Sequence, residues 1–161
     1  MRRFIVVAVV LLAVVGGPPP GTAAARARAA GSFTATLDLA TLTLVDVGPQ
    51  GCLLSVDGVL TFTGTIDGAA PGTTNALVAA PCASVATTPP GTFADVFAFR
   101  GTFAGNVGGE PASATLTYAG VTRPGGAIRA AMTMRGGAIA VLDVHATVGV
   151  GGTYVGLADA A

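Results

Sequence analysis

From Gly31 to the end of the chain, apolar residues recur at every second position, and short stretches rich in glycine and polar residues separate the runs. The runs over 93–103 and 140–148 are the most regular. Alternation with a period of two predicts β-strands that bury one face. The first run changes phase at 40–41, which indicates a β-bulge within one long strand.

The separators predict where strands end. Glycine accepts the positive φ of tight turns, so Asp57-Gly58 and Asp67-Gly68 are predicted turns, as are the glycines near 108 and 125. The proline-containing stretch 84–91 is predicted as the longest loop. About eight or nine short strands result, with no helical run among them. The pattern predicts an all-β fold, an antiparallel barrel of about eight strands, with a β-sandwich as the alternative. Closure favours the barrel because it removes strand edges.

The first 29 residues have the layout of an export signal. Arg2 and Arg3 precede an uncharged apolar run over 4–15, which is too short to span a bilayer as a helix. Small residues allow cleavage after Ala25 or Ala29, and the second site is preferred. The interpretation is a signal peptide at 1–29 and one barrel domain at 30–161, secreted or in the cell envelope, with no membrane anchor after cleavage.

The two cysteines, Cys52 and Cys82, are predicted to form a disulfide, because export places them where disulfides persist. The alternatives are two reduced buried thiols or a metal pair. Two cysteines without nearby histidine make a poor metal set, so no metal site is expected.

Composition narrows the function classes. The chain is 52% hydrophobic and 10% charged, which excludes general disorder. Removal of four signal arginines leaves four arginines against eight acidic side chains, a net charge of −4. Nucleic acids and anionic membrane surfaces are therefore disfavoured as partners. The complete lack of lysine beside abundant alanine and glycine is typical of GC-rich coding and suggests a bacterial source.

Few residues offer chemistry, and no cofactor fingerprint is present. Asp143 and His145 share one strand face, but the neighbouring apolar file predicts that this face points outward. Asp95 interrupts a file of phenylalanines, where a carboxylate is costly unless it is hydrogen-bonded or solvated near the strand entrance. Tyr118 and Tyr154 offer hydroxyls to a ligand or fill the core. Asp95 and Tyr118 are the candidate ligand-binding residues.

The rhythm of 102–105 (TFAG), 114–118 (ATLTY) and 151–156 (GGTYVG) resembles small secreted bacterial barrels related to the allene oxide cyclase and dirigent fold. The resemblance implies a barrel whose lumen binds an apolar ligand; plant members of that family rearrange or orient reactive lipids or phenols. No catalytic pattern of the family matches residue by residue.

The sequence therefore predicts a secreted barrel domain that binds a small apolar or amphiphilic ligand. The alternatives are a lumen-based isomerase or cyclase and an envelope or adhesion domain without a pocket. An enzyme would need an ionisable group facing the lumen, and Asp95 is the acidic candidate.

Overall fold

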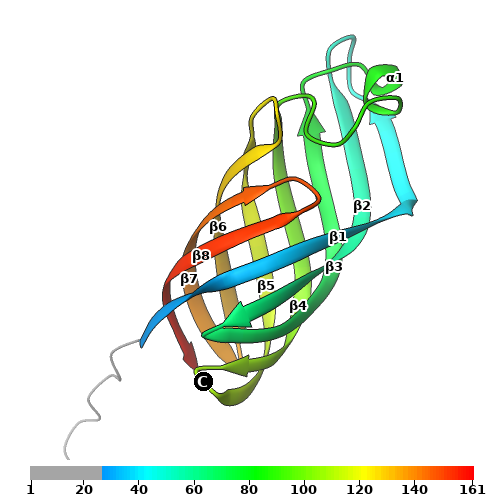
Figure 1. The fold of residues 1–161 in the computed structure, drawn as a ribbon. Coiled ribbons are helices and arrows are strands. Elements are labelled where there is room, and N and C mark those ends of the chain that lie inside the picture. The colour runs from blue at the N-terminus through cyan, green and yellow to red at the C-terminus, as the bar shows by residue number, and fades with distance from the viewer. Residues whose placement is uncertain (1–26) are drawn as a thin grey trace, which may run out of the picture.

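The computed structural model describes residues 27–161, which form a closed barrel of eight antiparallel strands (Figure 1). Each strand pairs with the next along the chain, and the last pairs with the first. The predicted antiparallel barrel is confirmed, and the sandwich alternative is excluded. The strands are β1 (Ala27–Asp46), β2 (Cys52–Gly64), β3 (Ile66–Val78), β4 (Asp95–Val107), β5 (Glu110–Thr122), β6 (Ala127–Gly136), β7 (Ala138–Thr147) and β8 (Gly151–Ala160).

The period-two pattern sorts side chains between the lumen and the outer surface. On β7, Ala140, Leu142 and Val144 are each 1% exposed or less, whereas Asp143 and His145 between them are exposed. Successive side chains of a strand point to opposite faces, so an apolar file fills the lumen. The predicted outward direction of Asp143 and His145 is confirmed.

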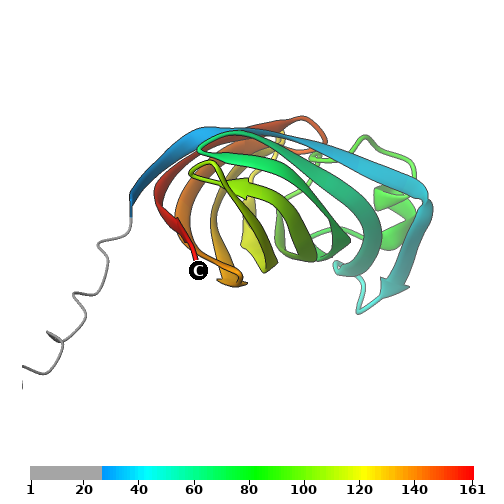
Figure 2. The ribbon, with the colours of Figure 1, turned by 90° about the horizontal axis from the view of Figure 1, so that it is seen from below.

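The first strand, β1, is long and pairs with both β2 and β8. Its residues Ala27 to Thr34 pair with β8, while its later part pairs with β2 alone and extends past β8 toward the β1–β2 connection (Figure 2). The register shifts between Asp38 and Thr43, which confirms the predicted bulge. A bulge bends a strand locally.

The prediction of turns at Asp57-Gly58 and Asp67-Gly68 is wrong. Both pairs lie inside strands, and the chain reverses at Thr65 instead. A Cβ atom on Gly58 would come within 2.5 Å of the Thr36 carbonyl oxygen of β1. This glycine therefore permits a close approach of neighbouring strands, a use that glycine shares with turns.

Other predicted turns are confirmed. Gly108 and Gly109 connect β4 to β5 with φ of 63° and 93°, and Gly125 and Gly126 connect β5 to β6 with φ of 94° and 85°. These are left-handed conformations that glycine adopts without a Cβ penalty.

The connection from β3 to β4 is the longest, and it contains one turn of helix, α1 (Cys82–Val85), that the sequence pattern did not predict. Cys52 at the start of β2 forms a disulfide with Cys82, with the Cα atoms 4.9 Å apart, which confirms the predicted pairing. Both cysteines are buried in a small second core with Val78 and Ala80. The buried disulfide indicates an oxidising environment.

The predicted signal up to residue 26 lies outside the described residues, and export stays a prediction. The structure bears on the cleavage site, however. Ala27, Arg28 and Ala29 pair with β8, and Ala29 is only 2% exposed. Cleavage after Ala25 would keep these pairs, whereas cleavage after Ala29 would remove them, and the choice between the two sites stays a prediction. Within residues 27–161, no helix is long and apolar enough to cross a membrane.

Candidate functional site

The barrel interior is solid at one end. Phe62 lies at the centre of an aromatic cluster, with ring centroids 5.7 Å from Phe33, 5.9 Å from Phe103 and 6.1 Å from Tyr154. Phe62, Phe103 and Tyr154 are among the most completely buried side chains. Tilted and edge-to-face rings at these distances pack favourably, so this end holds the core.

At the other end the interior holds a partly open cavity of about 260 Å³. Its lining residues come from all eight strands, and the loop between α1 and β4 covers part of it. The side chains that line it are overwhelmingly apolar, and its hydroxyl groups come from threonines and one tyrosine. The apolar walls include Phe33, Ala35, Leu37, Leu54, Val56, Leu60, Ala76, Val78, Phe97, Phe99, Ile128, Ala146 and Val148.

The covering loop, residues 85–93, is fixed at both of its ends. The disulfide holds α1 to β2, and Ala79 N–H donates to the Ala94 carbonyl at 2.9 Å. Across the opening, Gly125 N–H donates to the Gly91 carbonyl at 3.0 Å, which joins the loop to the β5–β6 turn. The loop therefore forms a roof with defined attachments, and it places Pro89, Pro90 and Phe93 against the cavity.

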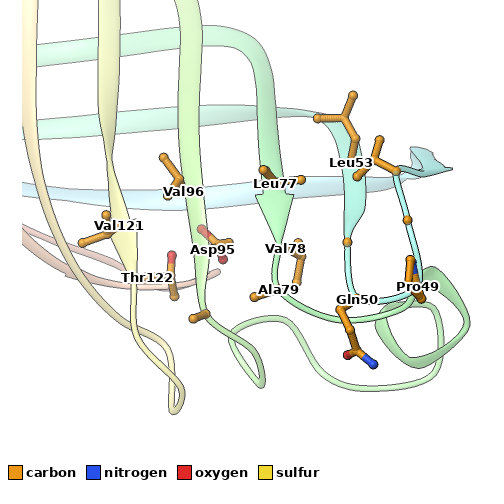
Figure 3. A pocket seen from close by; sticks show the side chains of 14 residues that line it. Pro49, Gln50, Leu53, Leu77, Val78, Ala79, Asp95, Val96, Val121 and Thr122 are labelled. Atoms are coloured by element: carbon orange, nitrogen blue, oxygen red, sulfur yellow. The ribbon is translucent and has the colours of Figure 1, made fainter.

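Asp95 stands at the rim of this cavity. It is the first residue of β4 and lies opposite Val78 of β3 and Thr122 of β5 in the strand register, and Figure 3 shows these three side chains next to one another. Its Oδ1 atom is buried without a hydrogen-bond partner. Burial raises the pKa of the Asp95 carboxyl, and a hydrogen bond with Thr122 partly opposes that rise.

Tyr118 lies further inside, on β5. Its side chain is 5% exposed and packs edge-on against Phe97 at 4.9 Å and Phe33 at 5.7 Å between ring centroids. The Tyr118 hydroxyl is buried and has no hydrogen-bond partner. Burial, and then the charge of Asp95, raise the pKa of Tyr118 above its usual value.

The structure thus brings the two candidate residues into one cavity. An unpaired buried polar atom is costly and uncommon in proteins, and two residues of this lining, Asp95 and Tyr118, each carry one. Asp95 and Tyr118 are the two titratable residues of the cavity lining. Among the described residues no arginine forms an ion pair with Asp95, and no group of three or more His, Cys, Asp and Glu side chains is suited to hold a metal.

Tyr154, the other hydroxyl considered from sequence, has a different role. Its hydroxyl accepts a hydrogen bond from Ile66 N–H at 2.9 Å and donates toward the carbonyls of Thr63 and Ile66, each at 3.2 Å. These bonds join β8 to the β2–β3 turn at the solid end of the barrel. Tyr154 is therefore a structural residue, and nothing in its neighbours along the chain distinguished it from Tyr118.

His145 and Asp143 lie on the outer surface, away from the cavity. Nε2 of His145 is 3.7 Å from Oδ2 of Asp143, and the two side chains are 55% and 72% exposed. Exposed ion pairs contribute little to stability. We expect His145→Ala to change the free energy of unfolding by less than about 0.5 kcal/mol in a denaturant titration. A loss above about 2 kcal/mol would show that this outer face is covered by something that the strand pattern does not indicate.

A second hollow lies on the outer surface and is larger, about 920 Å³, between the β1–β2 connection and the ends of β3 to β5 (Figure 3). It is open to solvent, since Val47, Leu53, Leu77 and Val96 along it are exposed. It shares Val78, Asp95 and Thr122 with the inner cavity. The inner cavity is the better candidate site because it is less open to solvent than the outer hollow.

The comparisons with known proteins bear on the fold. No family model matches the chain, and no match was found among curated proteins. One solved structure, a protein with unknown function from the DUF3224 family of Shewanella oneidensis MR-1, is similar with a TM-score of 0.59 at 15% sequence identity. The similarity covers 85% of this chain and 98% of the other. It shows a shared fold, and it gives no support to the resemblance to allene oxide cyclase and dirigent barrels.

Proposed function

We propose that this protein is an exported barrel that binds a small, mainly apolar molecule in its lumen. The observation that carries the proposal is the apolar cavity under the loop, with two lining residues that each carry a buried polar atom without a hydrogen-bond partner. Small-molecule sites are concave, mostly apolar and equipped with a few polar groups that fix orientation. A purely structural barrel would gain stability from filling this space with larger side chains.

The size of the cavity limits the ligand. At 260 Å³ it lies just below the usual range of ligand pockets, and it exceeds the engineered cavity of about 150 Å³ that binds benzene. The space therefore suits a molecule of about two fused rings or a short branched chain. A long acyl chain would not fit inside, and part of it would extend past the rim.

Binding can be tested with 2-methylnaphthalene, an apolar probe of two rings. The chain has no tryptophan, so naphthalene emission can be followed with little protein background. We expect saturable binding to the wild type and NMR shifts of the Ile128 and Ala146 methyl groups. Ala35→Phe, which places a ring inside the cavity, should weaken binding about tenfold or more.

The matched control is Thr36→Phe, because Thr36 is the neighbouring residue and points outward. It adds the same side chain to the same strand and should leave affinity unchanged. Equal binding by both variants would show that the probe binds outside the lumen. No binding by the wild type would overturn the proposal in favour of an envelope or adhesion domain.

A further inference from the structure

Resting on the proposed function, we propose that the preferred ligand of the lumen carries a positively charged amine beside its apolar body. Asp95 would bind that amine as its ion-pair partner, and the phenol oxygen of Tyr118 would offer a further acceptor deeper in the lumen. This class of ligand is supported by the negative charge of Asp95 in the lining, by the acceptors that lack donors and by the position of Asp95 at the rim.

The charge of the cavity lining favours a cationic ligand. Asp95 is the one charged side chain among the residues that line the cavity, and no lysine, arginine or histidine lines it. A bound carboxylate, such as a fatty acid, would enter a mainly apolar space with a like charge and no cation to offset it. A bound ammonium group would supply the missing counter-charge. Residues 27–161 contain eight acidic and five arginine side chains, so the outer field also favours cations.

The hydrogen-bonding capacity of Asp95 and Tyr118 also favours an amine. Oδ1 of Asp95 and the hydroxyl oxygen of Tyr118 are both buried, and neither has a partner among the described residues. An ionised carboxylate can only accept hydrogen bonds, and a primary ammonium group carries three donors and no acceptor. An ammonium group beside Asp95 can therefore donate to its carboxylate, and a hydrogen bond between two charged groups is the stronger kind.

The position of Asp95 in the cavity suits a charged group. Asp95 lies at the first residue of β4, next to the rim, while Tyr118 lies deeper against Phe33 and Phe97. A ligand that places its amine near the rim keeps its charge close to water and its rings within the apolar walls. This arrangement limits the desolvation cost of the charge.

Four probes with one naphthalene ring system test the inference: 2-naphthylmethylamine, 2-naphthylmethanol, 2-naphthoate and 2-methylnaphthalene. At pH 7 we expect the amine to bind about tenfold tighter than the alcohol, and the naphthoate to bind more weakly than 2-methylnaphthalene. Asp95→Asn, which keeps the shape and removes the charge, should reduce amine affinity about tenfold and leave 2-methylnaphthalene unaffected. Asp143→Asn is the matched control, since it removes an exposed charge outside the lumen.

The pH dependence provides an independent readout. Burial raises the pKa of Asp95, so its carboxylate is protonated at a higher pH than an ordinary aspartate. Amine affinity should be present above that pKa and be lost as the pH falls through it, whereas 2-methylnaphthalene should show no such loss. Tyr118 is the other titratable group facing this space, and its pKa is raised, so it stays neutral throughout. The outer groove adds no further titratable residue.

The outcomes separate the two proposals. If none of the four probes binds to the wild type, lumen binding itself fails. If 2-methylnaphthalene binds but the amine shows no advantage over the alcohol, or keeps its advantage in Asp95→Asn, lumen binding stands and the preference for amines is overturned. Equal binding of naphthoate and amine would overturn it as well.

Discussion

Replacing Cys52 and Cys82 together by alanine is expected to lower the free energy of unfolding by about 3.5 kcal/mol, because the disulfide closes a loop of 30 residues. Such a bond restricts the unfolded chain and so stabilises the fold. It also fixes α1 and the roof of the cavity to β2. The loss should appear in denaturant titrations, together with faster amide exchange over residues 85–93.

The wild type under reducing conditions is the matched control, since it loses the same bond without any change of side chain. Its stability should fall to that of the double variant within about 1 kcal/mol. A double variant as stable as the oxidised wild type would show that the β3–β4 connection is ordered by its own packing around Phe93.

Strand number, strand facing and the disulfide followed from sequence because each depends on local pattern or compartment. The alternation along 140–148 determines which face of β7 is buried, and no distant residue can change that. The bulge of β1 was visible as a change of phase at 40–41. With two cysteines in the chain, Cys82 was the one available partner for Cys52, and the predicted export indicated that the two would be bonded.

Turns were less predictable because one residue type serves two purposes. Gly58 and Gly68 look like turn residues, yet they lie in strands where neighbouring backbones come too close for a Cβ atom. That contact is made with residues distant in sequence, such as Thr36 and Gly105, and becomes visible only once the barrel is closed. Short hairpins are favoured locally, but the length of the paired strands decides where the chain reverses.

The sequence predicted one part of the candidate site and not the rest. Asp95 stood out because it interrupts an apolar file, and its place in the cavity follows from that file facing the lumen. The roof at 85–93 could not be predicted, since its position depends on the disulfide and on the contact between Gly91 and Gly125. The distinction between the two tyrosines also depended on tertiary contacts.

That distinction leads to opposite expectations for one chemical change. Tyr154→Phe removes a hydroxyl that holds Ile66 N–H and two carbonyls of the β2–β3 turn, so it should cost about 1–3 kcal/mol of unfolding free energy. Tyr118→Phe removes a buried hydroxyl that has no partner, so it should leave stability unchanged or raise it by up to about 1 kcal/mol. Denaturant titrations of both variants measure the difference.

Each tyrosine is the control for the other, because both side chains are at least 95% buried and lose the same atom. Tyr118→Phe should also weaken binding of the naphthylmethylamine probe without affecting 2-methylnaphthalene. Tyr154→Phe should leave the relative affinities of the two probes intact, because its hydroxyl lies at the solid end. If Tyr118→Phe proved as destabilising as Tyr154→Phe, the Tyr118 hydroxyl would have a partner in the free protein and would not be available to a ligand. If Tyr154→Phe alone lowers stability, the Tyr154 hydroxyl stabilises the fold and the Tyr118 hydroxyl is left for a ligand.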